Sequence, residues 1–324
     1  MTQLAREDFV QMHAPLYHPQ AREIERRSLA IANQYGLLGE DNLARFQAFS
    51  TLTSYVYPET SVERAVACAQ WCNWLFFFDD VYDESAAACQ DEAGLRAIMH
   101  KHLHALRTGE SEDNDGFSRF TLDFRQRILG FASSAWYARF CASAEEYLTG
   151  GTLIAARNWA AGRTPGLDEY FLQRDLDSAV ETAIDLIEVA RGFELPAHLA
   201  QSALTRRVRR AANRSISLFN DIVSYPKEVL KCGNPNNLVH VIMTELGCDL
   251  QHAMRYAVEI VNSSTRELLA LESAFVAQDP AHAGLLQSTF LGLRHWQRGN
   301  IESSLREARY RSPRSSFSEL QAAA

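Results

Sequence analysis

The sequence lacks any hydrophobic run long enough to cross a membrane. A transmembrane helix needs roughly 20 consecutive, mostly apolar residues, and no segment of the 324 residues approaches that length without charges. The first twenty residues also lack the apolar core of a secretory signal. We therefore expect a soluble, cytoplasmic protein with no membrane span.

Cysteine spacings typical of metal sites or redox pairs are also missing. No CxxC pair occurs, and structural zinc sites usually contain one. We expect buried free thiols, which are usual in a reducing cytoplasm. The cysteines are Cys68, Cys72, Cys89, Cys141, Cys232 and Cys248.

The chain has no excess of basic residues. Its formal net charge is −8, whereas a general nucleic-acid binder usually presents a basic face. We therefore expect no nucleic-acid partner. An anionic substrate is still compatible with this charge, because bound metal ions can reverse the local sign at a site.

Strand-like alternation is nearly absent, and helical spacing of apolar residues takes its place. Short turn-rich segments interrupt the pattern, but none is long enough to be a flexible linker. We predict an all-α protein with a single domain of about ten helices over residues 1–310 and a poorly ordered tail, 311–324. The predicted helices include 20–35, 61–84 (with Ser61 as a candidate cap), 91–107, 119–148, 167–192, 197–231, 237–245, 249–278 and 282–310.

An acidic cluster follows directly on a strongly apolar segment. Residues 71–78 are apolar on nearly every side of a helix, which indicates burial. Asp79, Asp80 and Asp83 then share one helix face, with Glu84 beside them. Their mutual repulsion favours a compensating cation, and hard oxygen ligands suit Mg²⁺. The alternative is an acidic helix end exposed to solvent.

A second polar stripe lies among apolar neighbours. Asn220, Ser224 and Glu228 are spaced at i, i+4 and i+8, so one helix face can carry all three. They offer hard oxygen donors, and Lys227 could reach an anion. Pro226 predicts a kink here. A polar outer face is the alternative, but the surrounding apolar residues weaken it.

Together these motifs resemble those of microbial class I terpene synthases. Residues 79–84 are similar to the family's aspartate-rich motif, and residues 220–228 are similar to its second metal motif. Arg174, 46 residues before Asn220, matches the diphosphate-sensing arginine. The resemblance covers about residues 15–310.

Three further positions carry the same resemblance. Asp177 and Ser178 match the linker and effector residues, and Arg309-Tyr310 matches the C-terminal pair that closes over the diphosphate. The chain departs from the family at Ser178, where glycine is common, and at Ser303, where tryptophan is frequent. These departures leave the class intact but prevent any transfer of product identity.

The resemblance implies a helical bundle around a central active-site cavity and a monomer or homodimer. It also implies three Mg²⁺ ions, with Mn²⁺ as a substitute: two on the aspartate-rich helix and one on Asn220, Ser224 and Glu228. A prenyl diphosphate, with farnesyl diphosphate favoured over geranylgeranyl diphosphate, would be ionised and its cation cyclised to a sesquiterpene. Residues implied in catalysis are Arg174, Asp177, Ser178 (through a nearby backbone carbonyl), Lys227, Arg309 and Tyr310.

An allylic cation needs a dry cavity with aromatic walls. For every aromatic candidate, ordinary core packing is the alternative. We favour Phe76, which precedes Asp79 by three residues, and Trp296 in the last helix. The other candidates are Tyr55, Phe77, Trp136, Phe140 and Phe193.

Two other patterns have simpler interpretations. The tract containing His100, His102 and His104 lacks further ligands, and we expect an exposed helix face. The basic run 206–210 is expected to be a solvated surface. Two rival functions remain: a chain-elongating prenyltransferase, which normally has two aspartate-rich motifs, and a non-catalytic isoprenoid-binding protein.

Overall fold

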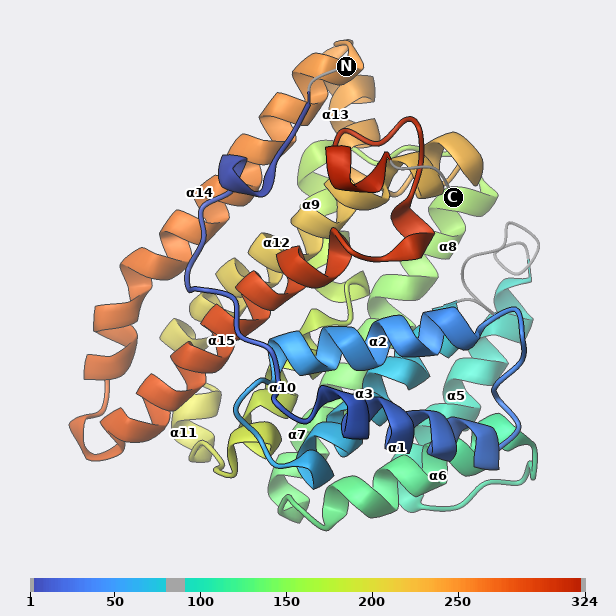
Figure 1. Cartoon of the computed structure of the whole chain (residues 1–324), viewed down its shortest axis with the longest axis vertical. Helices are drawn as coiled ribbons and strands as arrows, with labels where there is room; N and C mark the ends of the chain where they lie inside the picture. Colours follow the sequence, from blue (N-terminus) through green and yellow to red (C-terminus); the bar gives the residue numbers. More distant parts are fainter. Residues whose placement is uncertain (1–2, 80–90, 322–324) are drawn as a thin grey trace.

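Helices make up the regular structure throughout the part of the chain that the computed structural model describes, residues 3–79 and 91–321 (Figure 1). Within these ranges the only β-type pairing is one isolated bridge, between Leu4 and Phe317. The all-α prediction is therefore confirmed. The α-helices are α1 (Ala21–Gln34), α2 (Leu43–Val56), α3 (Val62–Phe78), α5 (Glu92–Thr108), α6 (Gly116–Leu129), α7 (Ser134–Glu145), α8 (Leu153–Ala160), α9 (Leu167–Asp177), α10 (Val180–Arg191), α11 (Ala197–Ala200), α12 (Ala203–Tyr225), α13 (Leu238–Leu246), α14 (Leu250–Ala277) and α15 (Ala283–Ser304).

Polar caps explain where several helices begin. Ser61 accepts a hydrogen bond from the backbone N–H of Arg64, as the sequence predicted. Ser133, Ser202 and Asp249 cap α7, α12 and α14 in the same way. Each cap satisfies a backbone donor that the first helical turn leaves unpaired.

Long predicted helices are divided in the structure. The segment 167–192 breaks between α9 and α10, and 119–148 breaks at Gly130 before continuing as α7. Two π-helical turns, η3 (Glu146–Thr152) and η4 (Pro226–Lys231), follow α7 and α12. Pro226, where the sequence predicts a kink, is the residue at which α12 changes to the π-helical turn η4. The other divisions carry weaker sequence signals, because apolar spacing continues across them.

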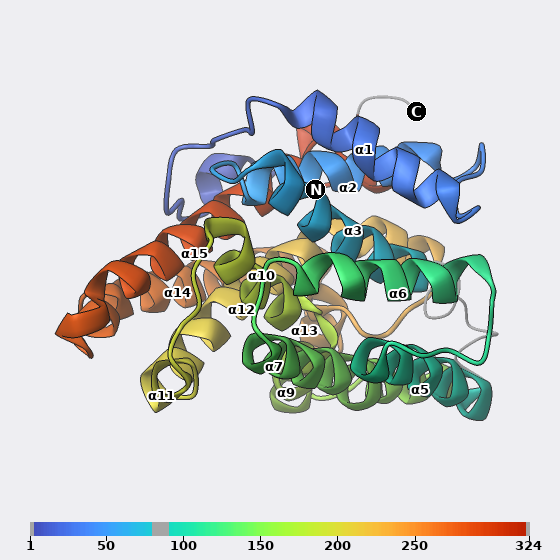
Figure 2. The same cartoon turned by 90° about the horizontal axis from the view of Figure 1, so that it is seen from below.

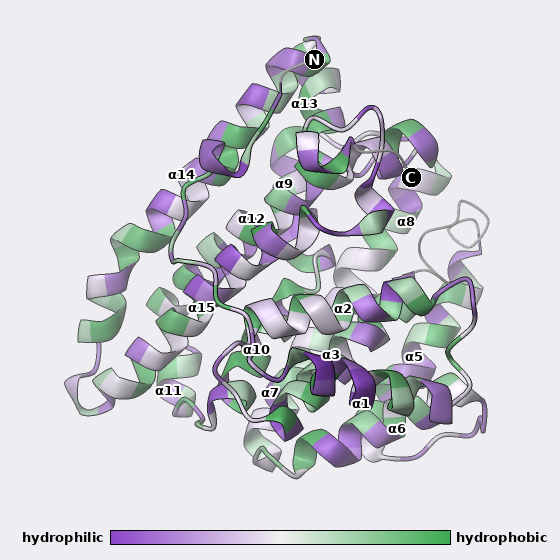
Figure 3. Ribbon diagram, viewed as in Figure 1, coloured by the Kyte–Doolittle hydropathy of each residue, from purple (hydrophilic) through white to green (hydrophobic). Residues whose placement is uncertain are grey.

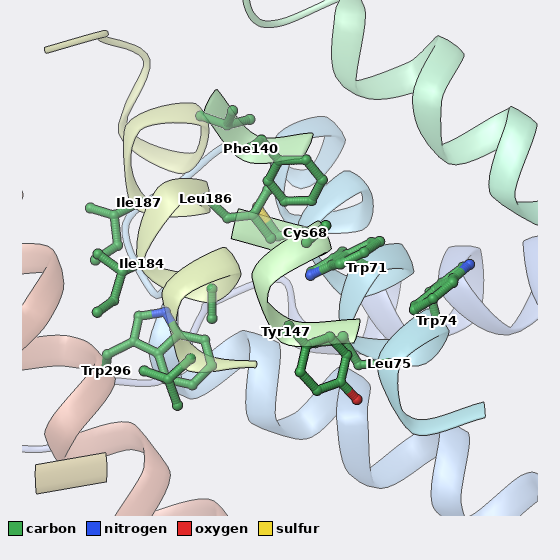
Figure 4. Close-up of a cluster of buried hydrophobic side chains, with 14 of the residues drawn as sticks. Cys68, Trp71, Trp74, Leu75, Phe140, Tyr147, Ile184, Leu186, Ile187 and Trp296 are labelled. Atoms are coloured by element: carbon green, nitrogen blue, oxygen red, sulfur yellow. The ribbon is translucent and has the colours of Figure 1, made fainter. Parts of the chain in front are cut away.

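Aromatic side chains fill the interior around α3. Trp71 and Trp74 stack with ring centroids 4.8 Å apart, and Phe140 of α7 meets Trp71 edge-on at 4.9 Å (Figure 4). Both tryptophans are fully buried, and their indole N–H groups donate to Thr182 and Thr121, each at 2.8 Å. This aromatic core, in which both indole N–H groups are hydrogen-bonded, fixes the orientation of α3 and therefore the position of its C-terminal residues.

The outer helices have one apolar face each. Hydrophilic and hydrophobic residues alternate along α14 (Figure 3), and its buried residues recur at helical spacing. Helix α14 packs along α12, and α15 packs against α2. Seen from below, α1 and α2 lie on the opposite side of α3 from α5 (Figure 2). No helix among the described residues is long and apolar enough to span a bilayer.

The C-terminal tail is packed rather than loose. Phe317 is fully buried, and its ring centroid lies 6.1 Å from those of Phe9 and Phe219. Our prediction of a poorly ordered tail is therefore wrong for residues 311–321, because one buried aromatic residue anchors it to the N-terminal segment and α12. The last three residues lie outside the described part.

Two predictions, one about the basic run 206–210 and one about the cysteines, are corrected in part. Arg209 belongs to the basic run, yet its guanidinium reaches inward to Glu181 at 2.7 Å and to the buried Asp185 at 2.9 Å. Of the cysteines, Cys68, Cys72 and Cys141 are buried free thiols, as expected, whereas Cys232 is exposed and Cys248 is partly exposed. Cys89 lies outside the described residues.

His102 is buried, contrary to our expectation of an exposed tract. His100 and His104 are exposed, but His102, on the opposite side of α5, contacts the Thr121 hydroxyl at 3.0 Å. Burial lowers the pKa of His102 to about 3. The folded protein therefore holds this imidazole neutral.

Acid should destabilise the protein through His102. The unfolded chain binds a proton here below pH 6.5, while the folded chain resists it down to about pH 3. Stability contributed by this group is thus present above pH 6.5 and lost as the pH falls, by up to about 1.4 kcal/mol per pH unit. Urea unfolding of wild type and His102→Gln across this range should show a shallower slope in the variant. Identical slopes would contradict the assignment.

Candidate active site

One cavity of about 200 Å³ collects most of the predicted site residues. Its lining combines charged and polar residues with apolar ones. The lining residues come from α2, α3, η3, α8, the α9–α10 junction, α12, η4 and the segment after it, α15 and the segment after α15. The predicted residues that line it are Phe76, Asp79, Arg174, Asp177, Ser178, Asn220, Lys227, Glu228, Trp296, Arg309 and Tyr310.

Asp79 stands where α3 leaves the aromatic core. The Tyr147 hydroxyl, on the π-helical turn η3, donates to the Asp79 carboxylate at 3.0 Å. A π-helical turn inserts an extra residue and is frequent at functional sites, where it redirects a side chain. Asp80, Asp83 and Glu84 were predicted to act beside Asp79; they lie outside the described residues.

The second polar motif faces the same cavity from α12 and η4. Asn220 uses its amide nitrogen to donate to the Tyr310 hydroxyl at 2.7 Å. Glu228 follows Pro226, and its carboxylate accepts a hydrogen bond from Asn237 at 2.9 Å. Ser224 is fully buried and is not among the lining residues. Its role as a metal ligand therefore stays a prediction.

Asn237 ties the turn that presents Glu228 to the helix before it. Its side-chain nitrogen also donates to the backbone oxygen of Asp221 at 2.9 Å, and its oxygen accepts from the N–H of Val239 at 3.1 Å. The residue is fully buried, so its hydrogen bonds to Asp221 and Val239 are shielded from water, while the one to Glu228 is partly buried. Asn237 thereby caps α13 and positions Glu228 at once.

Arg174 lines the cavity and is held between two carboxylates. It contacts Asp177 at 3.0 Å and Asp221 at 2.8 Å. Tyr170 and the N–H of Leu238 donate to the second oxygen of Asp221. Burial alone would lower the pKa of Arg174, but the neighbouring carboxylates outweigh it and raise that pKa. Arg174 is therefore a preoriented cation.

The junction between α9 and α10 is strained. Ala179 has φ 58°, a left-handed conformation that a non-glycine residue rarely adopts. The neighbouring Ser178 donates from its hydroxyl to Asn213 at 2.9 Å, and Asn213 donates to the Asp175 carbonyl at 2.9 Å. These hydrogen bonds stabilise the interruption between α9 and α10. Asp177 and Ser178 therefore face the cavity instead of continuing into one long helix.

The Arg309-Tyr310 pair lies in η6 (Ala308–Tyr310), and both residues line the cavity. The Arg309 guanidinium lies 4.8 Å from the ring centroid of Phe76 and 4.5 Å from that of Tyr310. Phe49 stacks on Phe76 with ring centroids 3.5 Å apart, and the same guanidinium lies 5.5 Å from the Phe49 centroid. Burial raises the pKa of the Tyr310 phenol, so it remains a hydrogen-bond donor.

Comparison with known proteins decides the family. Residues 70–267 match a family described as terpene synthase family 2, C-terminal metal binding. The (+)-T-muurolol synthase of Roseiflexus castenholzii, named as cyclising (2E,6E)-farnesyl diphosphate, is 30% identical over 90% of both chains. The germacrene A synthase of Nostoc punctiforme is 28% identical over 89% of both. The chain belongs to terpene synthase family 2.

The chain is therefore a class I terpene cyclase, and the family implies a prenyl diphosphate substrate and a metal-binding domain. A crystal structure of the reconstructed ancestral protein SVS_A2 superimposes with a TM-score of 0.83 at 26% identity, covering 92% of this chain and 89% of that one. The all-α class I fold expected from the sequence is thus confirmed.

Only two of the aromatic candidates line the cavity of this terpene synthase: Phe76 and Trp296. The prediction that Phe77 is a wall residue is wrong, because it is turned about 100° from Phe76 on the helix and packs on Phe117 at 4.7 Å. Tyr55 is also misassigned, because it packs against Tyr17 at 4.5 Å. The remaining candidates outside the lining are Trp136, Phe140 and Phe193, all packed in or against the main core.

Several lining residues escaped the sequence analysis. Tyr147, Trp159, Asn236 and Asn300 all face the cavity. Only Tyr147 had a nearby signal, because Gly150-Gly151 interrupts a helical pattern that otherwise continues. No role in the site was predicted for the other three, and their position at the cavity depends on how the helices pack.

Gly151 permits the close approach of η3 to the α9–α10 junction. A Cβ at Gly151 would lie 2.3 Å from the backbone nitrogen of Asp177, whereas one at Gly150 would meet only Leu176, at 3.6 Å.

We expect Gly151→Ala to displace Asp177 and lower turnover at least about tenfold, since small misplacements in an active site can cost about 100-fold. Gly150→Ala should retain activity. Steady-state kinetics with circular dichroism provides the check; equal activity of both variants would contradict it.

Proposed function

We propose that this terpene cyclase uses Mg²⁺ to ionise farnesyl diphosphate and cyclises the resulting cation to a sesquiterpene. The observation that carries the proposal is the convergence of Asp79 with Asn220 and Glu228 on one cavity that apolar residues, including Leu75, Phe76, Ile216 and Trp296, also line. The relative named as cyclising farnesyl diphosphate supports a substrate with a fifteen-carbon prenyl chain. Geranylgeranyl diphosphate is the alternative substrate.

The donor set at the cavity suits hard divalent cations. Asp79 and Glu228 supply carboxylates and Asn220 an amide oxygen, which are the ligands that Mg²⁺ accepts alongside substrate phosphates. Two facing carboxylates favour a cation between them. When bound, Mg²⁺ would stabilise charge on the leaving diphosphate. We assign three ions to Asp79, Asp80 and Asp83 on one side and to Asn220, Ser224 and Glu228 on the other.

Cationic side chains in the lining would hold the diphosphate. Arg174, Lys227 and Arg309 line the cavity, and such groups form strong, charge-assisted hydrogen bonds to phosphate oxygens. Tyr310 can donate one more. Because Asp177 and Asp221 already orient Arg174, little of its binding free energy is lost in ordering it. Heterolysis sends the C–O electron pair to the diphosphate and leaves an allylic cation.

The apolar lining residues would guide that cation. Phe76 and Trp296 offer ring faces, each worth about 0.5–2 kcal/mol to a cation, and Leu75 and Ile216 help to exclude water. The Arg309 guanidinium already rests 4.8 Å from the Phe76 centroid, which supports this ring as a cation-binding surface.

Product analysis tests the proposal directly. The purified protein is incubated with Mg²⁺ and, separately, with geranyl, farnesyl and geranylgeranyl diphosphate, and the products are identified by mass spectrometry. Cyclic fifteen-carbon products from farnesyl diphosphate are expected. Twenty-carbon cyclic products would favour the alternative substrate. A longer diphosphate would indicate chain elongation, and unchanged substrates would indicate a non-catalytic binding protein.

Removing a ligand from either side of the cavity should stop the reaction. We expect Asp79→Ala and Asn220→Ala each to abolish turnover while leaving the helical circular dichroism intact. Asp168→Ala, at an exposed position of α9, serves as a control and should keep full activity. Wild-type turnover in either cavity variant would overturn the metal assignment.

Loss of the hydrogen bonds by which Asn237 positions Glu228, here called the Asn237 clamp, should weaken metal binding without removing a metal ligand. We expect Asn237→Ala to raise the Mg²⁺ concentration needed for half-maximal activity by about 10–100-fold, the usual effect of losing a partner that orients a ligand. Asn237→Asp should be worse, because it turns the donor that faces Glu228 into an acceptor. An unchanged Mg²⁺ requirement in folded Asn237→Ala would show that the clamp is only structural.

A further inference from the structure

A separate cluster of metal-binding side chains lies where α11 meets the turn between α14 and α15. His198 belongs to α11, whereas Asp279 and His282 belong to the turn, the first capping η5 (Pro280–His282) and the second within it. Figures 1 and 2 both place α11 close to this turn. Among the described residues, it is the one group of three or more histidine, cysteine or acidic side chains whose ligand atoms all lie within 4.8 Å of one another.

Both imidazoles converge on a single carboxylate oxygen. His198 Nε2 lies 3.2 Å and His282 Nδ1 2.9 Å from Asp279 Oδ2, and all three ligand atoms lie within 4.8 Å of one another. In a tetrahedral zinc site, bonds of about 2.0–2.1 Å place neighbouring ligand atoms roughly 3.3 Å apart. The observed spacing is therefore close to that of a metal-bound set, and small side-chain rotations would complete it.

The carboxylate at the centre of this cluster is oriented by the backbone. Asp279 caps η5, and its other oxygen accepts a hydrogen bond from the N–H of Ala281 at 3.0 Å. This leaves Oδ2 directed at the two rings, which stand edge-to-face with centroids 5.9 Å apart. Partners that orient a ligand in this way are a regular feature of metal sites.

We propose that His198, Asp279 and His282 form a second cation site, selective for a borderline divalent ion such as Zn²⁺. Two imidazoles and one carboxylate form a ligand set typical of zinc, with a fourth position for water. The cavity instead offers oxygen donors that suit Mg²⁺. The bound ion would join α11 to the α14–α15 turn and stabilise both. This inference does not depend on the proposed reaction.

Calorimetric titration with Zn²⁺ tests the site. The full-length protein, purified without a histidine tag, is titrated in excess Mg²⁺ so that the oxygen ligands of the cavity are already engaged. We expect one Zn²⁺ per chain and a higher midpoint of thermal unfolding with Zn²⁺ present. His198→Ala and His282→Ala should each weaken binding more than about tenfold, since losing even a partner of a ligand costs about that much.

His252→Ala is the matched control, because His252 is exposed on α14 but far along the helix from the turn. It should bind Zn²⁺ like the wild type, and circular dichroism should show that all variants are folded. Three results would overturn the proposal: no Zn²⁺ binding by the wild type, wild-type affinity in both His198→Ala and His282→Ala, or loss of binding in Asp79→Ala, which would assign the ion to the cavity.

Discussion

Carboxylates and cationic side chains gathered around one small cavity impose the main electrostatic constraint on this protein. Asp79 and Glu228 face the cavity from two different helical segments, and Arg174 lies between two further carboxylates beside them. Charges taken out of water are costly unless they are paired and hydrogen-bonded. Each therefore has a specific partner: Tyr147 for Asp79 and Asn237 for Glu228.

Irregular backbone around the cavity makes this pairing possible. The π-helical turns η3 and η4 present Tyr147 and Glu228, and the left-handed Ala179 opens the junction that carries Asp177. In uninterrupted α-helices, these side chains would point in different directions, because each residue would be rotated relative to its position in the observed structure. Such strain costs about 1–3 kcal/mol at a site and persists only when packing supports it. Here the aromatic core and the close contact at Gly151 supply that support.

The polar and apolar residues that line the cavity suit the two stages of a cyclisation. Cationic and hydroxyl donors can hold a diphosphate, while Phe76 and Trp296 offer ring faces to a cation. The histidine cluster at the α14–α15 turn has different chemistry. Its nitrogen ligands would select a softer ion than the oxygen ligands proposed in the cavity, so the two sites would not compete for the same metal.

The sequence by itself determined the all-α class and most helix positions, and it predicted the two polar motifs that contribute Asp79, Asn220 and Glu228 to the cavity, because these depend on spacing between near neighbours in one helix. It also identified Arg174 and Arg309 through family resemblance. Only the tertiary structure decided which aromatic side chains face the cavity, that Tyr147 and Asn237 support the acidic residues, and that the tail packs through Phe317. Those features depend on contacts between segments far apart in the chain, and local periodicity carries no information about them.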